Sequence, residues 1–453
     1  MSSPIEGKSL KRAIRSGTIF FIIMLFSAGI SQTVAENELS NLTSEDQGAI
    51  IDSISKAMNE IYVFPDVAGE MEKLIRKKHE DGEYKALATI PEFAQQLTED
   101  LRSISRDKHL SVQPLPPRPE GQPDLSPEEE KKQYITQAKK RNFNFKKLEI
   151  LSGNVGYLKF DSFVDAGISG KTAVAAMNFL ANSQALIFDL RENGGGSPSL
   201  IQLISSYLFD EPVHLNSFYI RKTDETKQFW TQANVEGPKM TDIPVYVLTS
   251  KFTFSGAEEF TYNLKNMKRG TIVGETTGGG AHPVEFHAFE SYHVGLRVPF
   301  GRAVNPITKT NWEGTGVEPD ISVPAEDALL VAHMEILKRL KNDSVNEQEK
   351  VKFQWYLDGL AAKKEPFDLK TEDLQAYTGR YGPRKIQLQE GGLYYQRDNR
   401  PAFYMIPMKK DWFMFEELEY FRIEFRRDDT GRAIEIVGHY DNGDSDSHKR
   451  TEE

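Results

Sequence analysis

The sequence predicts a layered α/β core, preceded by a small helical domain and followed by an all-β accessory domain. Three observations support this fold class. In the middle of the chain, short apolar runs alternate with helical stretches, which is typical of buried strands in βαβ units. Before that region, apolar residues recur at helical spacing. After it, short strand-like runs are separated by turns, which indicates a compact antiparallel domain.

The composition fits a globular chain of several domains and excludes some classes of function. The 453 residues are 39% hydrophobic and 27% charged, which is enough for two or three packed domains. Because 67 acidic residues outnumber 56 basic ones, the net charge is −11, and the chain lacks the basic surface that a nucleic-acid partner needs. The absence of cysteine excludes disulfides, cysteine-ligated metal sites and a cysteine nucleophile.

The first 35 residues are predicted to be a signal peptide. Four basic residues precede an uncharged stretch whose apolar centre is at residues 19–26, and small residues lead to Ala35, after which we expect cleavage. The apolar centre is shorter than the ~20 residues that span a bilayer, so an uncleaved anchor is the less favoured alternative. We therefore expect an exported protein, periplasmic or extracellular, with no stable membrane insertion after cleavage.

Residues 36–113 are expected to form the N-terminal helical domain. Their apolar residues fall into three helical stretches, and Thr43 with Asp46 resembles a capping box at the start of the first one. Residues 114–141 follow as a proline-rich linker and one helix. Ser126 is the expected N-cap of that helix, which begins with acidic residues and ends with basic ones, as the helix dipole favours.

The core domain is expected at residues 142–332 and a helical connector at residues 333–364. The predicted strands are residues 155–160, 185–189, 245–249 and 271–273, and the predicted helices are residues 170–182, 199–209 and 256–267. Residues 365–453 are expected to form the C-terminal β domain, a small antiparallel barrel or half-barrel. Its many aromatic residues are interpreted as its core, and a carbohydrate-binding surface is the less favoured alternative.

Two segments of the core carry candidate catalytic residues. Residues 189–196 place three consecutive glycines after a buried strand, where backbone N–H groups can approach a ligand and form an oxyanion hole. In residues 249–260 a strand ends, and Ser255 opens a helix whose first residue is Gly256, so the helix dipole would favour an alkoxide-like nucleophile. Each segment has a structural alternative. The glycines could form a plain loop, and serine is a favoured N-cap.

Together with two later motifs, these segments resemble the tail-specific, or C-terminal-processing, serine protease family. The later motifs are the glycine-rich turn at residues 274–280 and residues 312–320. The resemblance covers roughly residues 42–332 and implies the layered α/β fold that ClpP and the crotonases share. Members with a serine–lysine dyad carry their lysine in the glycine-rich turn and usually insert a PDZ domain before the core. This chain has neither, so it is similar to the branch of the tricorn core protease and the interphotoreceptor retinoid-binding protein.

The resemblance to that branch implies a catalytic triad. The segment around His109 matches the histidine segment of the branch, and Glu313 matches its glutamate. In this interpretation, Ser255 attacks a peptide carbonyl, His109 takes and returns the proton, and Glu313 orients the imidazolium. Gly195 and Gly256 would donate their N–H groups to the oxyanion.

Several alternatives stay open from the sequence. His282 and His287, near the glycine-rich turn, are competing bases, and Glu313 could instead pair with Arg302. The chain has no HExxH or comparable ligand spacing, so neither a catalytic metal nor a cofactor is expected.

The expected function is that of an exported serine endopeptidase with polypeptide substrates and no nucleic-acid partner. One alternative is a non-catalytic carrier of an apolar small molecule on the same fold. Another is acyl transfer or hydration of a thioester, by analogy with the crotonases.

Overall fold

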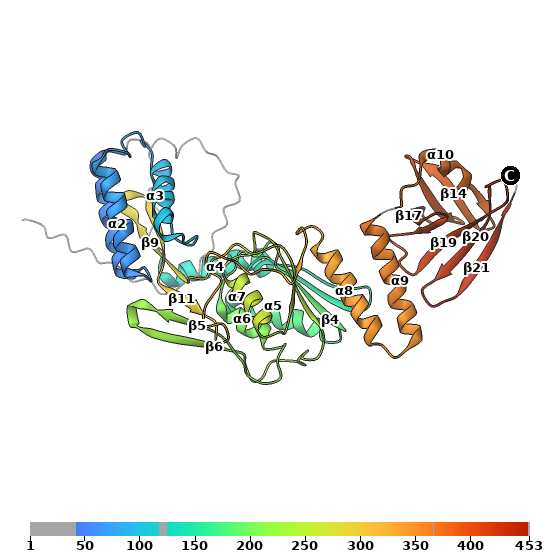
Figure 1. Cartoon of the computed structure of the whole chain (residues 1–453), viewed down its shortest axis with the longest axis horizontal. Helices are drawn as coiled ribbons and strands as arrows, with labels where there is room; N and C mark the ends of the chain where they lie inside the picture. Colours follow the sequence, from blue (N-terminus) through green and yellow to red (C-terminus); the bar gives the residue numbers. More distant parts are fainter. Residues whose placement is uncertain (1–41, 117–124, 366, 452–453) are drawn as a thin grey trace, which may run out of the picture.

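The computed structural model describes residues 42–116, 125–365 and 367–451, and it confirms the predicted fold class. A helical part lies at one end, an α/β core in the middle and a β-rich part at the other end (Figure 1). The predicted signal peptide at residues 1–35 and much of the proline-rich linker lie outside the described residues. Within the described part of the chain, no helix is both long and apolar enough to cross a membrane.

The N-terminal part consists of three helices and one strand, followed by a separate helix. These elements are α1 (Ser44–Ile61), α2 (Pro65–Glu80), α3 (Ile90–Ser105), β1 (Ser111–Pro114) and α4 (Pro127–Lys140). The predicted capping box at the start of α1 is present, because the Asp46 N–H donates to Thr43 Oγ1 at 3.2 Å and the Thr43 N–H donates to Asp46 Oδ2 at 3.1 Å. Ser126 caps α4, also as predicted.

A hairpin that the sequence analysis did not predict completes the N-terminal part. β1 pairs antiparallel with β10 (Val294–Pro299), which in turn pairs with β9 (Val284–Phe289). Leu97 of α3 and Leu296 of β10 are fully buried in the same apolar cluster. Burying one such side chain contributes roughly 1.5–3 kcal/mol. The shared apolar cluster therefore holds the three helices to the hairpin, and through it to the core (Figure 1).

The core contains a six-stranded sheet with helices on both faces. Its strands, in spatial order, are β12 (Ile321–Ser322), β8 (Thr271–Gly274), β7 (Val245–Thr249), β4 (Ala185–Asp189), β3 (Val155–Phe160) and β2 (Phe145–Leu151). All neighbours run parallel except β2 and β3. Helices α5 (Ala166–Phe179), α6 (Pro198–Ser205) and α7 (Gly256–Asn266) cover one face, and α8 (Ala328–Asp343) covers the other. The predicted core strands and helices are thereby confirmed.

A second sheet of the core was missed by the sequence analysis. Its order is β11 (Gly301–Val304), β5 (His214–Ile220) and β6 (Glu225–Trp230), and all pairs are antiparallel. Most side chains of β6 are exposed, so this strand gives no apolar run in the sequence. Phe218 of β5 packs against an apolar cluster that contains Ala303 and Trp312. The sheet therefore contributes one wall of the candidate site.

The C-terminal part begins with α9 (Glu347–Lys364), which packs on α8, and continues with α10 (Thr371–Leu374). It then forms a nine-stranded antiparallel sheet. In spatial order its strands are β16 (Phe403–Tyr404), β15 (Gly392–Arg397), β14 (Arg384–Gln389), β13 (Gly379–Tyr381), β21 (Ser445–Thr451), β20 (Ala433–Tyr440), β19 (Phe421–Arg427), β18 (Trp412–Met414) and β17 (Ile406–Lys409). The two end strands, β16 and β17, are neighbours in the chain, so the sheet curls into a barrel-like form.

The aromatic residues of this sheet divide between its interior and its surface. Tyr395, Phe413 and Phe415 are buried in its core, as predicted. Tyr404 is 46% exposed and does not belong to that core.

Candidate active site

Two loops meet at the carboxyl edge of the central sheet. Because β4 and β7 are parallel neighbours, the loops that follow them lie side by side. The Phe254 N–H donates to the Asn193 carbonyl oxygen at 3.1 Å, and Ser250 Oγ donates to the Arg191 carbonyl oxygen at 2.5 Å. These bonds fix the glycine-rich loop against the segment that leads to Ser255.

Ser255 stands at the start of α7 in a strained conformation. Its backbone has φ 54° and ψ −122°, whereas an ordinary N-cap residue is extended. Such a conformation in a non-glycine residue costs on the order of 1–3 kcal/mol and is concentrated at functional sites. The side chain lines a pocket. The predicted position of Ser255 is correct, and its backbone is not that of a simple helix cap.

The glycine-rich loop lies against the start of α7, next to Ser255. A Cβ added to Gly195 would lie 2.6 Å from the Gly256 nitrogen, so no side chain fits there. The Gly195 N–H already donates to Asn193 Oδ1 at 2.8 Å, and it is not free for the expected oxyanion role. Among the described residues, the N–H groups of Gly196 and Gly256 have no acceptor, and both residues line the pocket with Ser255. The structure therefore offers Gly196, in place of Gly195, as the neighbour of Gly256.

Glu258, a residue that the sequence analysis did not single out for the site, ties Ser255 to the glycine-rich turn. Its buried carboxyl group accepts bonds from the Ser255 N–H at 2.8 Å, the Gly279 N–H at 2.7 Å, the Gly280 N–H at 2.9 Å and Thr277 Oγ1 at 2.5 Å. Burial raises the pKa of Glu258, while these bonds favour the charged form. A glutamate three residues after a helix-opening serine was the available signal.

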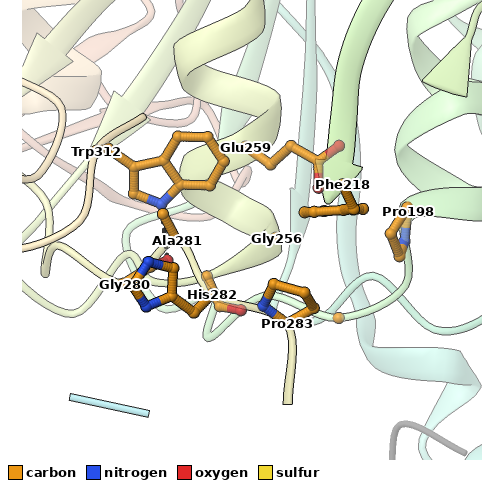
Figure 2. Close-up of a pocket in the computed structure, with 11 residues that line it drawn as sticks. Pro198, Phe218, Gly256, Glu259, Gly280, Ala281, His282, Pro283 and Trp312 are labelled. Carbon is orange, nitrogen blue, oxygen red and sulfur yellow. Dashed lines mark hydrogen bonds between the residues drawn. The ribbon is translucent and has the colours of Figure 1, made fainter. Parts of the chain in front are cut away.

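His282 lies close to two carboxyl groups at the candidate site. Its Nδ1 lies 2.6 Å from Asp107 Oδ2 and 3.5 Å from Glu313 Oε2, and the residue lines the pocket with Ser255 (Figure 2). Burial opposes a charge on His282, but the hydrogen bond to Asp107 and the nearby negative charges outweigh it and raise the pKa of the imidazole. Burial, assisted by the charge of Asp107, raises the pKa of Glu313 to about 7.

Glu313 is oriented by the backbone and does not pair with Arg302. Its Oε2 accepts the Ala281 N–H at 2.5 Å, and its Oε1 is buried without a hydrogen-bond partner. Arg302 instead stacks over the ring of Tyr219, with 5.4 Å between the guanidinium carbon and the ring centroid. The predicted histidine partner of Glu313 is His109, but in the structure Glu313 lies close to His282 instead.

His109 lies beside the site without a hydrogen bond to Ser255 or Glu313 within the described residues. Its ring stacks on Phe254, with 4.6 Å between centroids, and its Cε1 would lie 2.7 Å from a Cβ added to Gly280. Its Nδ1 is buried and has no partner. Burial lowers the pKa of His109 to about 4, so the imidazole is neutral at pH 7.

The neighbours of His109 connect the N-terminal part to the core. Lys108 Nζ donates to the Gly278 carbonyl oxygen at 2.5 Å, and Asp107 binds His282. Asp107, His282 and Glu313 offer three ligand atoms within 4.8 Å of one another, so they could also hold a divalent cation. His287, the other competing base, is paired with Glu285 on β9 at 2.7 Å and does not line the pocket.

Sequence comparisons match both the helical part and the core. Residues 154–323 match peptidase family S41, and residues 37–148 match the N-terminal domain of peptidase S41 in eukaryotic IRBP. The carboxyl-terminal-processing peptidase 2, chloroplastic, of Arabidopsis thaliana is 30% identical over 176 residues, which cover 38% of this chain. The chain spans about a third, 32%, of the length of that curated relative.

Similar solved structures are distant in sequence. The photosystem II D1 C-terminal processing protease has a TM-score of 0.38 at 16% identity, covering 63% of this chain and 94% of that chain. The tricorn protease has a TM-score of 0.40 at 14% identity, covering 63% of this chain and 35% of that chain. The two sequence matches together span more than half of the chain, in the order helical part and then core. The chain therefore belongs to peptidase family S41.

Proposed function

We propose that this protein is a serine peptidase whose nucleophile is Ser255. The observation that carries the proposal is the strained backbone of Ser255 at the start of α7, beside two N–H groups that have no acceptor, those of Gly196 and Gly256. A sharp strand-to-helix turn presents a serine hydroxyl to a substrate, and two convergent N–H groups stabilise the oxyanion that its attack creates. Membership of peptidase family S41 supports the same chemistry.

The reaction follows from these positions. Ser255 Oγ attacks the carbonyl carbon of the scissile bond, and its proton passes to a histidine while Gly196 and Gly256 bind the oxyanion. The histidine then gives the proton to the leaving amine as the C–N bond breaks, which leaves an acyl-enzyme ester. Water, deprotonated by the same histidine, hydrolyses that ester and regenerates the serine.

His109 is the base in this proposal, and Glu313 is its carboxylate partner. The pKa of His109, about 4, keeps the imidazole neutral and able to accept a proton at pH 7. The buried Nδ1 of His109 and the buried Oε1 of Glu313 both lack partners, and pairing them would satisfy both atoms. His282, held by Asp107 next to Glu313, is a positioning residue for this carboxylate.

The carrier function has weaker support from the pocket. The cavity volume of the pocket is about 20 Å³. Sites for small molecules usually measure about 300–1,000 Å³ and are mostly apolar. This pocket is smaller, and the carboxyl group of Glu259 lies in its wall. One substrate side chain suits such a pocket better than a whole apolar ligand.

The natural substrates in this proposal are polypeptides outside the cytoplasm. The basic and apolar pattern of the first 35 residues supports export, with cleavage after Ala35. Only residues 141–144 separate α4 from β2, so no PDZ domain lies between them.

Hydrolysis of unfolded casein or a quenched peptide library by the purified protein tests this function. We expect Ser255→Ala to abolish turnover with little change in melting temperature, and His109→Ala to lower kcat by roughly 10³-fold or more. His282→Ala should lower it less, because His282 acts through Glu313. Full activity of Ser255→Ala would refute the proposal. Loss of activity in His282→Ala with retention in His109→Ala would assign the base to His282.

A further inference from the structure

The pocket beside Ser255 is lined by apolar side chains, one acidic group and the imidazole of His282. Its apolar side chains are those of Pro198, Phe218, Ala281, Pro283 and Trp312 (Figure 2). Ser255, Gly196 and Gly256 line the same pocket. A carbonyl group held by these N–H groups for attack therefore places the side chain of its own residue at the pocket. In a peptidase this is the side chain on the acyl side of the scissile bond.

Glu259 contributes the acidic group. It lies one helical turn after Ser255 on α7, so that the two side chains project from the same face of the helix. Glu259 as a whole residue is only 2% exposed, and its carboxyl group is directed toward Phe218 in Figure 2. Among the described residues, no cation pairs with it. Burial raises the pKa of Glu259 to about 8, because nothing positive compensates its charge.

Within the described part of the chain, the polar side chain that acts on this carboxyl group is that of Asn216 on β5. It favours the charged form of Glu259. Both polar atoms of the Asn216 amide are buried without a hydrogen-bond partner of ordinary geometry. A buried carboxyl group and a buried amide, both short of partners, are costly in a folded protein unless a ligand completes them. The pocket wall therefore contains one polar site, formed by Glu259 and Asn216, that lacks hydrogen-bond partners.

A side chain that suits this pocket needs an apolar stem and a cationic end. Lysine and arginine have both, because their methylene groups pack on apolar surface while the head group stays polar. A cationic head group would stabilise the deprotonated form of the buried Glu259 carboxyl group. It would also form a charge-assisted hydrogen bond with that group. An acidic side chain would be repelled, and a purely apolar one would leave the carboxyl group unpaired.

We propose that this pocket selects lysine or arginine on the acyl side of the scissile bond, with Glu259 as the residue that determines this specificity. The proposal rests on the proposed function and deepens it by naming the class of substrate. Glu259 touches the substrate side chain and not the reacting atoms, so it governs which peptides are cut and leaves the activation of Ser255 unchanged.

Two aminoalkyl diphenyl phosphonates test the pocket directly, one with a lysine side chain and one with the uncharged norleucine side chain. Both react with an activated serine, and the ratio of their labelling rates at Ser255 measures the specificity. We expect the lysine probe to label the wild-type protein at least ~10-fold faster, which corresponds to the ~1.4 kcal/mol that one tenfold step represents. In Glu259→Gln, which keeps the shape, the ratio should fall close to one.

Two controls separate this proposal from the proposed function. Glu318→Gln makes the same substitution at an exposed glutamate outside the pocket and should leave the ratio unchanged. A simple fluorophosphonate without a side chain for the pocket should label Ser255 in both wild type and Glu259→Gln, which shows that the nucleophile is still active in the variant. Equal rates of the two phosphonates in a wild-type protein that this reagent labels would overturn the pocket proposal alone. Failure of the fluorophosphonate to label wild type would overturn the proposed function and the pocket proposal with it.

Discussion

At the scale of single residues, two adjacent glutamates at the start of α7 differ because of their surroundings. Glu258 accepts four hydrogen bonds from Ser255 and the glycine-rich turn, whereas Glu259 has no cation beside it. Both side chains are buried. Four hydrogen bonds favour the charged form of the first against the effect of burial, and the second keeps its proton well above the usual pH range of a glutamate. This contrast gives two opposite expectations for their glutamine variants.

Glu259→Gln should change how the stability of the protein depends on pH. In the unfolded chain Glu259 ionises near its ordinary value of 4.5, but in the folded protein its pKa is about 8. Between these values the unfolded state binds fewer protons, so the free energy of unfolding falls as the pH rises. The loss amounts to on the order of 3 kcal/mol between about pH 5 and about pH 8. Urea unfolding of both proteins at the two pH values should show this loss in wild type and a smaller one in the variant.

Glu258→Gln should destabilise the protein at neutral pH. The amide would turn a donor toward N–H groups that now bind a carboxylate oxygen, and at least one of these groups would be left without an acceptor. The expected cost is about 3 kcal/mol, which a shift in the urea midpoint at unchanged slope would measure. Since Glu259→Gln is its matched control, equal stability losses in the two variants would contradict the roles assigned here.

At the scale of elements, the glycine-rich loop and α7 approach too closely for side chains. A Cβ on Gly196 would lie 2.2 Å from the Phe163 carbonyl oxygen, and φ at this residue is 141°. Gly194, in the same loop, has no atom within 4 Å of its added Cβ. The surrounding atoms therefore require a glycine at position 196 but not at position 194.

Gly196→Ala should consequently disable the site, while Gly194→Ala should not. Displacing the Gly196 N–H removes one oxyanion donor, an effect typically worth about 10²–10³ in kcat. Peptide hydrolysis and melting temperature measured on both variants separate loss of the donor from loss of folding. If Gly194→Ala lost as much activity as Gly196→Ala, the oxyanion assignment would lose its support.

At the scale of the whole molecule, the segment around His109 belongs to the N-terminal part and Ser255 belongs to the core. The hairpin of β9 and β10 connects these two parts. Leu296 of β10 is buried among the helices of the N-terminal part. Asp107 joins the same part to His282 in the core. The position of His109 relative to Ser255 therefore depends on this packing.

Leu296→Ala should loosen the hairpin and the three helices together. Such a truncation typically costs 2–5 kcal/mol, on the order of a core leucine in other proteins. Hydrogen exchange followed by mass spectrometry should show faster exchange in α1, α3 and β10 and none of this change in β19 to β21. Ile423→Ala, in the C-terminal sheet, should give the opposite pattern. Faster exchange confined to the hairpin would show that the helices are held by other contacts.

The sequence predicted the elements whose patterns are local and missed those that depend on distant partners. The central strands are apolar runs and the N-terminal helices carry their own caps, so both were predictable. β6 has mostly exposed side chains, and β10 is buried only because the helices cover it, so neither gives a clear local pattern. In the site, Ser255 followed from its motif. Three other features of the site depend on the folded loops and not on a local pattern. They are the hydrogen bond from Gly195 to Asn193, the bonds from the glycine-rich turn to Glu258, and the pairing of His282 with Asp107.

The measurement that tests the central claim most directly is the site of covalent labelling by a fluorophosphonate. Intact mass and peptide mapping should show one adduct, on Ser255, that is absent from Ser255→Ala and weaker in His109→Ala and Glu313→Ala. An activated serine reacts with such reagents once its base is neutral, and the pKa of His109 is about 4, so labelling should occur between about pH 5 and about pH 9. An adduct on another residue, or none across that range, would contradict the assignment of Ser255 as the nucleophile of this protein.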